Sequence, residues 1–206
     1  MNRPQNLAQL LQDMRGCEQT RGQSVLAHGE GVWATFEKML AHLRDPQSHP
    51  AKDWWRLPNW LTEESARVLQ GLPPLEVMRE YLVHHDCGKP YCLQIDAEGR
   101  RHFPGHAAMS QEIWLSIGGS PEAAELMFLD MEAHLLKAEG IASFAARPQA
   151  LTLLLSATAE VHANAEMFGG VDSDSFKIKA KNLTKRGGQA VQLIIRNATA
   201  PKGATP

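Results

Sequence analysis

Apolar residues recur at helical spacing along most of the chain. Residues 6–14 and 24–43 carry them every three or four positions, the pattern of a helix that buries one face. The same spacing continues over residues 61–72, 74–88, 106–119, 120–140, 150–168 and 172–183. The sequence therefore predicts helices over all of these segments.

Start and stop signals support two of these helices. Gly88 and Pro90 follow the segment 74–88 and end it, because glycine favours a helix C-terminus and proline cannot continue a helix. Ser120 is the expected N-cap of the segment 120–140, with Pro121 at its first helical position and Gly140 as its stop.

Two segments break the helical pattern. Residues 91–103 form two short alternating runs around Ala97-Glu98-Gly99, which predicts a β-hairpin. Residues 44–60 hold three prolines and the tryptophans Trp54, Trp55 and Trp60, which predicts an ordered loop anchored by aromatic side chains.

The predicted architecture is a single all-α domain, residues 1–206, with a small β-hairpin insertion. No internal repeat and no alternation of strands and helices argues for another class. The core is expected over about residues 23–169, and residues 170–206 form a basic helical C-terminal extension. At 206 residues the chain is long enough to enclose such a core.

Composition narrows the classes of function. Hydrophobic residues make up 43% and charged residues 21% of the chain, and the formal net charge is −2, which excludes a uniformly basic nucleic-acid-binding surface. No apolar run reaches the length of a membrane span, and the N-terminus lacks the apolar stretch of a signal peptide. Three cysteines, none in a CxxC pair, favour a reducing cytoplasm.

Several catalytic motifs are absent. The paired glycines of "FGGVDSDS" and "KRGGQ" match neither GxxxxGK[ST] nor GxGxxG. No GxSxG elbow is present, so a serine hydrolase of that type is unsupported. Cys87 lies two residues from His85 and points to a different side of a helix, so a cysteine nucleophile carries little weight.

Histidine chemistry is the informative signal. His85 and Asp86 are adjacent at the end of a predicted helix, where a slight unwinding turns both side chains toward one cation. Imidazole and carboxylate together suit Mn²⁺, Fe²⁺, Co²⁺, Ni²⁺ or Zn²⁺. His106 begins a later helix after Gly105, which allows a close backbone approach. His134 is expected in the middle of a helix, with Asp130 one turn earlier on the same face.

The order of His28, then His85-Asp86, then later ligand-type side chains resembles the HD superfamily of metal-dependent phosphohydrolases, whose signature is H…HD…D. The stretch "HDCGKPYCLQIDAEGRRHFPGHAAMSQEIW" is similar to the HD domain of bacterial tRNA nucleotidyltransferases, with its HDxGKP, its hairpin and its GH opening a helix. The likeness is specific over residues 82–114. No nucleotidyltransferase head is present, so it implies the hydrolase module alone.

The resemblance implies a set of metal ligands. His28, His85 and Asp86 match the first three ligands of the motif, and His106 and His134 fall where two-metal members place further histidines. The last ligand of the family is an aspartate, but "LLLSATAEVHANAEMFGG" has none. Glu160 is expected in its place, with His162 and Asn164 as competitors. Asn164 shares a helix face with Glu160, whereas His162 points elsewhere.

The implied function is hydrolysis of a phosphoester with one or two divalent ions, acting on a nucleotide or an RNA-end phosphate such as a 2′,3′-cyclic phosphate. Such an ion activates water and neutralises charge on the phosphoryl oxygens. The alternatives are hydrolysis of a free nucleotide (a 5′-monophosphate, a deoxynucleoside triphosphate or a cyclic nucleotide) and a non-catalytic, metal-containing nucleotide-binding module. No protein partner is obvious, and a homodimer stays open.

Further residues are expected to serve the reaction or the substrate. Asp86, Lys89 and Asp130 are the expected catalytic residues, with Lys89 as the cation facing the substrate phosphate and Asp130 as a proton carrier or a group that orients His134. Arg100, Arg101 and Asn164 are expected to contact substrate, and His84 to pack behind the site. A basic segment near the C-terminus is a weaker candidate for guiding a nucleotide, through Lys177, Lys179, Lys181, Lys185 and Arg186.

Overall fold

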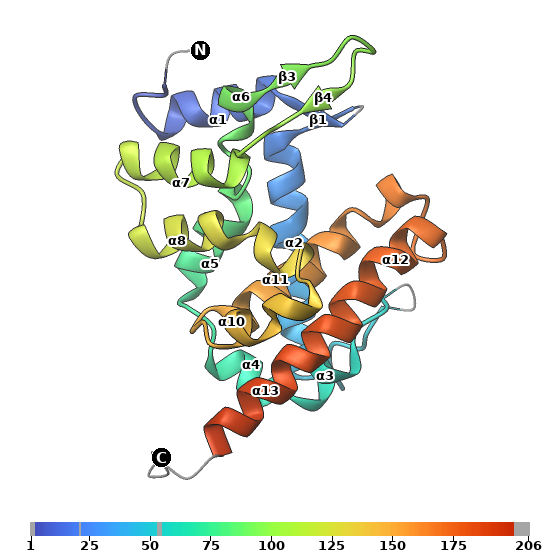
Figure 1. Ribbon diagram of the computed structural model, residues 1–206. Coiled ribbons are helices and arrows are strands. Elements are labelled where there is room, and N and C mark those ends of the chain that lie inside the picture. Colours follow the sequence, from blue (N-terminus) through green and yellow to red (C-terminus); the bar gives the residue numbers. More distant parts are fainter. Residues whose placement is uncertain (1–2, 21, 53–54, 200–206) are drawn as a thin grey trace. The chain divides into compact units, whose positions relative to one another are not determined.

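The protein is predominantly helical. The computed structural model describes residues 3–20, 22–52 and 55–199 and is 68% helix and 5% strand (Figure 1). The prediction of an all-α protein with a small β-hairpin is confirmed at this level. The finer prediction, an HD-type domain, is taken up below as a proposal.

The chain divides into two compact units. The first combines Met1–Leu40 with Leu72–Met131, and the second combines Ala41–Gly71 with Glu132–Pro206. Organisation as one HD-type domain stays a prediction. The elements that lie within the first unit are α1 (Leu7–Gly16), β1 (Glu18–Thr20), β2 (Gln23–Ser24), α5 (Leu75–His84), α6 (Lys89–Cys92), β3 (Gln94–Ile95), β4 (Arg101–His102), α7 (His106–Ser116) and α8 (Pro121–Leu129). Helices α2 (Val25–Arg44) and α9 (Met131–His134) begin in the first unit and end in the second.

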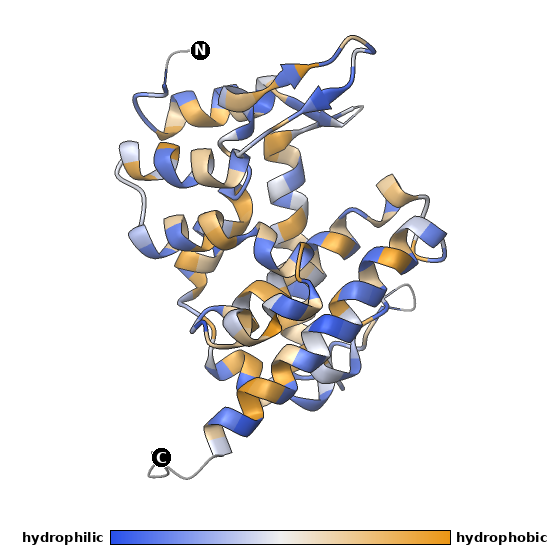
Figure 2. Cartoon of the chain, viewed as in Figure 1, coloured by the Kyte–Doolittle hydropathy of each residue, from blue (hydrophilic) through white to orange (hydrophobic). Residues whose placement is uncertain are grey.

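Packing in the first unit follows the apolar faces of its helices. Helix α8 packs against α7 and α5, and α1 packs against α6. Leu10, Phe36, Met78, Tyr81 and Met127 are fully buried, while the same helices carry hydrophilic residues on their other positions (Figure 2). Burial of these side chains is the main favourable term in folding, and it fixes the helices that carry the histidines.

The predicted hairpin is confirmed. Strands β3 and β4 pair antiparallel, with Gln94 opposite His102, and Gly99 adopts the positive φ of 77° that its turn requires. A second two-stranded pair, β1 with β2, was not predicted, because its strands of three and two residues are too short to show an alternating pattern.

The helix predicted over residues 120–140 is not continuous: its α-helical parts are Pro121–Leu129 and Met131–His134, and the segment ends in the 3-10 turn Ala138–Gly140. Its start is confirmed, since the Ser120 side chain accepts a hydrogen bond from the backbone N–H of Ala123 and Pro121 is the first residue of α8. The helix then stops at Leu129, and His134 is the last residue of the four-residue α9 rather than the middle of a long helix. Asp130 interrupts the ladder, which fits the weak helix propensity of aspartate.

The second unit is built around α11 (Ala150–Ala163), which is buried over almost its whole length. Helices α4 and α12 pack against it. The helix predicted to reach residue 168 ends at Ala163, and the one predicted over 61–72 breaks at Glu64. The other elements of this unit are α3 (Asn59–Glu63), α4 (Ser65–Gln70), η1 (Ala138–Gly140), α10 (Ile141–Ala145), η2 (Ala165–Phe168), α12 (Asp174–Asn182), the π-helical turn η3 (Leu183–Gly187) and α13 (Gly188–Thr199).

The loop before α3 is anchored by aromatic side chains, as predicted. Trp55 and Trp60 are buried, and the Trp60 indole donates a hydrogen bond to the Leu183 carbonyl of η3. The prediction for Trp54 lies outside the described residues. Among residues 3–20, 22–52 and 55–199, no helix combines the length and apolar character needed to cross a membrane.

Candidate metal centre

A close helix contact places His28 beside His85. A Cβ atom built on Gly29 would lie 2.1 Å from the backbone oxygen of Val83, so only glycine lets α2 come this near to α5. His28 and His85 flank this contact and are 1% and 3% exposed. Their rings meet edge to face, with centroids 5.1 Å apart.

The turn after α5 directs His85 and Asp86 into the same space. Helix α5 ends at His84, and backbone bonds from Cys87 to His84 and from Lys89 to Asp86 close two tight turns. Adjacent side chains of a continuing helix would diverge, since each residue advances the helix by about 100°. Here the side chains nevertheless meet, with His85 Nε2 3.3 Å from Asp86 Oδ2, although His85 keeps helical backbone angles and the backbone is not unwound.

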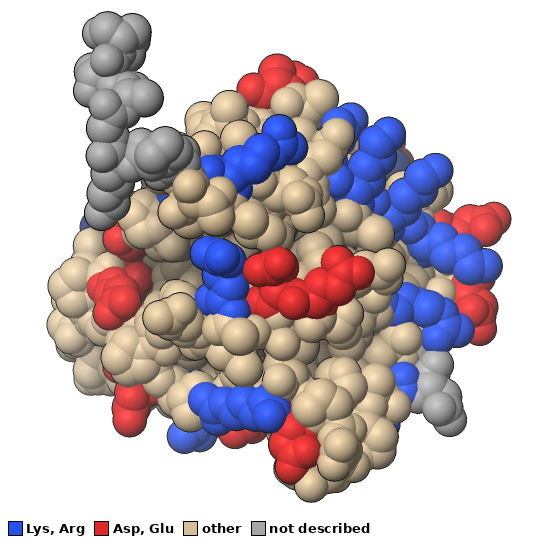
Figure 3. Space-filling model, turned by 90° about the horizontal axis from the view of Figure 1, so that it is seen from below, with Lys and Arg blue, Asp and Glu red and all other residues tan. Residues whose placement is uncertain are grey.

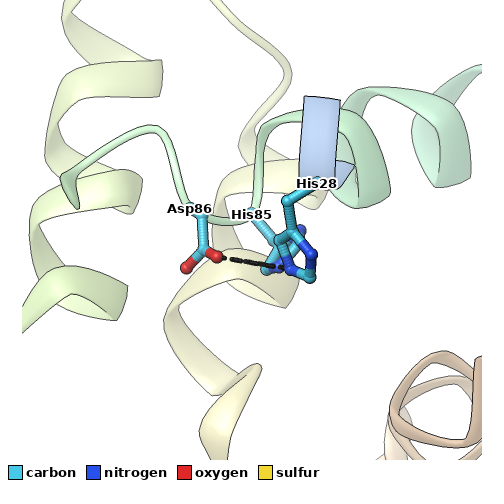
Figure 4. A group of neighbouring side chains, drawn as sticks. All are labelled: His28, His85 and Asp86. Atoms are coloured by element: carbon cyan, nitrogen blue, oxygen red, sulfur yellow. Dashed lines mark hydrogen bonds and ion pairs between the residues drawn. The ribbon is translucent and has the colours of Figure 1, made fainter. Parts of the chain in front are cut away.

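Three donor atoms converge on one point (Figure 4). The Nε2 atoms of His28 and His85 lie 3.2 Å apart, and Asp86 Oδ2 lies 3.6 Å from the first and 3.3 Å from the second. Two ligands about 2.1 Å from one ion are separated by roughly 3.0 Å in octahedral and 3.4 Å in tetrahedral geometry. The three residues could therefore hold a single metal ion, and all three are buried.

Backbone carbonyls orient the rings of His85 and His106. His85 Nδ1 is 2.9 Å from the Leu82 carbonyl, and His106 Nδ1 is 3.0 Å from the Phe103 carbonyl. A carbonyl oxygen only accepts, so each Nδ1 carries the proton and donates it. In the neutral ring the lone pair is then on Nε2, which in both residues faces Asp86.

His106 is near the second carboxylate oxygen of Asp86. Its Nε2 is 3.5 Å from Asp86 Oδ1, and its side chain is 19% exposed against 4% for Asp86. The close backbone approach expected at Gly105 is wrong, since a Cβ there would meet nothing within 4 Å; this glycine instead adopts a φ of 69°. The close approach is at Gly88, where a Cβ would lie 2.5 Å from the backbone nitrogen of Ser110.

Lys89 forms an ion pair with Asp86, three residues earlier in the chain. Its Nζ is 2.6 Å from Asp86 Oδ2 and 3.0 Å from Gln19 Oε1, and it stands over the Phe103 ring. Burial opposes ionisation of Asp86, but the neighbouring His85 ring and the Lys89 ammonium group outweigh it and hold the pKa of this carboxyl well below its usual range. The ammonium group thus neutralises the carboxylate, and its role toward a substrate phosphate stays a prediction.

Asp130 is bound to a tyrosine of the same unit. The Tyr81 hydroxyl donates a hydrogen bond of 2.5 Å to Asp130 Oδ1, and both side chains are buried. Tyr81 also lies edge to face with His85, their centroids 6.5 Å apart. The tyrosine was not anticipated, because a single tyrosine at an apolar helix position gives no signal of such a role.

The second unit brings together three of the residues that sequence reasoning named. His134 Nε2 is 2.8 Å from Glu160 Oε2, and the Asn164 amide is 3.5 Å from Glu160 Oε1. His162 points elsewhere, as its helix position predicts: its ring bonds the Thr158 carbonyl and accepts from the backbone N–H of Arg56. Ligand roles for His134 and Glu160 stay predictions.

The arginines expected to contact substrate are engaged in ion pairs. Arg100 bonds Asp96 and Glu98 within the hairpin, and Arg101 pairs with Glu18 at 2.6 Å. His84, expected behind the site, stacks on Trp114 with centroids 4.5 Å apart. Gln19 and Phe103, which hold Lys89, were missed, since neither belongs to a recognisable motif.

Three comparisons with known proteins, against family models, curated sequences and solved structures, find no match to this chain. What the protein does is therefore inferred from the geometry of the cluster and from the resemblance of its motif.

Proposed function

We propose that the protein is an HD-type metal-dependent phosphohydrolase of all-α fold, acting on a nucleotide or an RNA-end phosphate such as a 2′,3′-cyclic phosphate. The single observation that carries the proposal is the convergence of His28 Nε2, His85 Nε2 and Asp86 Oδ2 within 3.6 Å of one another. Two imidazole nitrogens and a carboxylate oxygen at these separations suit a bound cation.

The identities of the three donors indicate the kind of ion. Two imidazoles and one carboxylate suit Mn²⁺, Fe²⁺, Co²⁺, Ni²⁺ or Zn²⁺ rather than Mg²⁺ or Ca²⁺, which prefer oxygen ligands. A divalent ion in this position would supply Lewis acidity toward a phosphoryl oxygen and an activated water. Three protein ligands leave coordination positions open for both, as catalytic sites require.

The chain's own residues would orient the ligands and the substrate. The Leu82 carbonyl fixes the His85 ring, and the depressed pKa of Asp86 keeps this carboxylate ionised across the neutral range. His106 and Lys89 are more exposed than the buried ligands, at 19% and 12%. They therefore stand on the side from which a phosphate group would approach, where the Lys89 ammonium would neutralise phosphoryl charge.

One observation favours the alternative of a non-catalytic, metal-containing nucleotide-binding module. Lys89 Nζ lies 2.6 Å from Asp86 Oδ2, so the ammonium group is engaged by a carboxylate of the chain itself and does not face a reacting phosphoryl group. Turnover separates the two functions, because a binding module would hold nucleotide without converting it.

The test begins with protein purified without chelator. Inductively coupled plasma mass spectrometry should find a transition metal near stoichiometric amount in the wild type and in His102→Ala, which removes an exposed hairpin histidine 54% accessible to solvent. His85→Ala and Asp86→Ala should lose the metal and remain helical by circular dichroism. Unchanged metal content in those two variants would place the site wrongly.

Activity is then measured on bis(p-nitrophenyl) phosphate, p-nitrophenyl phosphate and a panel that includes 2′,3′-cyclic nucleotides, each with Mn²⁺, Co²⁺ and Ni²⁺. Turnover that disappears in His85→Ala supports the hydrolase. No turnover with any metal, in protein that binds metal normally, leaves the binding module. Hydrolysis of 5′-monophosphates, deoxynucleoside triphosphates or cyclic nucleotides in preference to 2′,3′-cyclic phosphates would instead select the free-nucleotide hydrolase.

The resemblance also assigns His106, His134 and Glu160 as ligands of one or two ions. Glu160→Ala and Glu160→Asp test this assignment, since a shorter carboxylate retains a ligand oxygen and alanine removes it. Metal content that falls in the alanine variant and is retained in the aspartate variant supports a ligand role. Unchanged content in both would restrict Glu160 to its contact with His134.

A further inference from the structure

The second unit contains a pocket of about 320 Å³ beside α12 and η3. Its apolar lining comes from Val171, Phe176 and Ala180, and the Thr184 hydroxyl adds a polar group. Its remaining lining residues are four cations: Arg56, Lys177, Lys181 and Lys185. Lysine and arginine side chains gather on part of the face shown in Figure 3.

Local structure explains how the lysines form a row. The Ser173 side chain caps α12 by accepting from the backbone N–H of Phe176, and the fully buried Phe176 ring fixes the helix against the core. Lys177 and Lys181 are four residues apart, which places them on one face about 6 Å apart along the axis. Lys185 follows after four more residues, within the π-helical turn η3.

The π-helical turn packs against the side chain of Trp60. The Trp60 indole donates to the Leu183 carbonyl at the start of the turn, and a Cβ on Gly187 would lie 3.1 Å from the same indole nitrogen. Turns of this kind are rare and frequently occur at functional sites. Here the turn presents Thr184 and Lys185 to the pocket.

A buried histidine positions Arg56, another residue that lines the pocket. His162, 3% exposed, accepts from the backbone N–H of Arg56 at 3.0 Å and lies edge to face with Phe176. The Arg56 guanidinium bonds Asp172 at 3.2 Å, a carboxylate whose side chain is 81% exposed. Buried contacts thus position two of the residues that line the pocket, Phe176 and Arg56.

The charge of the row is not compensated within the described part of the chain. None of the ion pairs between described residues involves Lys177, Lys181 or Lys185, whereas Arg56 is paired with Asp172. Like charges four residues apart disfavour a helix, and an anion between them would reverse that effect. The row is thus complementary to a phosphate group or a short chain of phosphates.

We propose that this pocket binds a nucleotide through its phosphate groups, with the sugar or base against the apolar floor. Charge selects a phosphate, while the apolar lining and a volume at the lower end of the range for small-molecule sites select one attached nucleoside. The same chemistry is offered by a free nucleotide and by one unit of a single strand. The pocket lies within the second unit and its occupation does not depend on a metal at His28, His85 and Asp86.

The experiment measures binding in EDTA, so that failure of the metal site and failure of this pocket are distinguishable. The probes are adenosine triphosphate, inorganic triphosphate and a fluorescein-labelled ten-residue oligodeoxythymidylate. Their binding is measured by calorimetry or fluorescence anisotropy at low salt. The test variant is Lys177→Gln/Lys181→Gln. Its control is Lys137→Gln/Lys179→Gln, which removes two charges from the same unit without altering the residues that line the pocket.

Adenosine triphosphate or the oligonucleotide should bind to the wild type more tightly than inorganic triphosphate. The test variant should weaken that binding at least tenfold and the control variant no more than about twofold. Binding of the oligonucleotide alone assigns the pocket to single strands, and binding of both assigns it to nucleotides in general. Equal weakening in the two variants, equal affinity for inorganic triphosphate, or no binding of either nucleotide probe at millimolar concentration would overturn the proposal.

Discussion

Gly29 lies so close to Val83 that a Cβ atom on the glycine would come within 2.1 Å of the valine backbone oxygen. This contact between α2 and α5 sets the separation of His28 from His85, the two residues that flank it. The geometry of the candidate metal centre therefore depends on a residue that offers no ligand at all. Gly29 directly follows His28 in the sequence, but the pattern of a single chain does not show that Gly29, rather than Gly31, makes the close helix contact.

Gly29→Ala should destabilise the protein by roughly 1–3 kcal/mol, because the helices must separate to admit the methyl group. It should also lower metal content by moving His28 away from His85. Gly31→Ala is the control, since a Cβ there meets nothing within 4 Å; alanine should stabilise the helix by about 0.5–1 kcal/mol. Urea unfolding followed by circular dichroism measures both, and equal effects of the two substitutions would refute the packing argument.

Ser110 supports the turn that carries Asp86. Its hydroxyl accepts from the backbone N–H of Gly88 at 2.9 Å, and the side chain is fully buried. Ser110→Ala should cost about 1–3 kcal/mol because a buried donor loses its acceptor. It should also weaken metal binding about tenfold or more, as loss of a group behind the ligands does.

The matched control is Ser116→Ala on the same helix, whose hydroxyl donates to the Ile113 carbonyl. Its effect on stability should stay within about 0.5 kcal/mol, with metal affinity unchanged. Competition with a chelating dye gives the affinities. A Ser110→Ala variant that binds metal as tightly as wild type would show that the turn keeps its geometry without this bond.

Lys89→Gln should separate the roles of the ammonium ion and a metal ion at Asp86. Without the lysine, metal-free protein retains a buried carboxylate that has lost its nearest cation, which costs about 3 kcal/mol. A divalent ion should then raise the melting temperature of Lys89→Gln more than that of the wild type, since it restores the missing charge. Lys137→Gln, an exposed lysine of the other unit, should respond as the wild type does. A smaller metal-induced shift in Lys89→Gln than in wild type contradicts the competition.

The buried His162 should make stability depend on pH. Burial lowers its pKa below the usual 6.5, and protonation would remove the acceptor that Nε2 offers to the Arg56 N–H. Because the folded pKa is depressed, the unfolded chain binds more protons, so this contribution is present above about pH 6.5 and lost as pH falls below it. The loss approaches about 1.4 kcal/mol per pH unit at most.

His162→Gln keeps an acceptor and removes the titration. Its unfolding free energy should therefore fall less between pH 7 and pH 5 than that of the wild type, as measured by urea unfolding at each pH. His42→Gln, which replaces a histidine bonded to the His49 carbonyl at the surface, controls for general histidine loss. Parallel pH profiles for wild type and His162→Gln would exclude the buried histidine as the source.

Sequence patterns were sufficient for the elements that repeat over several turns. The helices at α1, α2, α5, α7 and α11 and the β3–β4 hairpin were predicted from spacing alone. The break within the segment 120–140 was not, because its residues are apolar on nearly every side between Leu126 and Leu136; periodicity then cannot reveal where the ladder breaks. Only the tertiary contact from Tyr81 shows why Asp130 is a natural place for that break.

The candidate site was also predicted only in part. Adjacent His85 and Asp86 at a helix end give a visible signal, and the resemblance added His28 from more than fifty residues away. The groups that orient these residues give no signal in the sequence. The carbonyls of Leu82 and Phe103 are backbone groups, and every residue has a backbone carbonyl. Contacts made by backbone atoms are set by tertiary packing, so a single sequence cannot display them.

The reactivity of Cys87 can report on the opening of the turn at Asp86. The thiol is completely buried, bonds the Ser110 carbonyl, and burial raises its pKa to about 12. A thiolate-directed reagent can therefore reach it only during a local opening of the turn. In a variant that lacks Cys17 and Cys92, the rate of alkylation would then time the opening of the candidate metal centre in solution, without any substrate or metal being known.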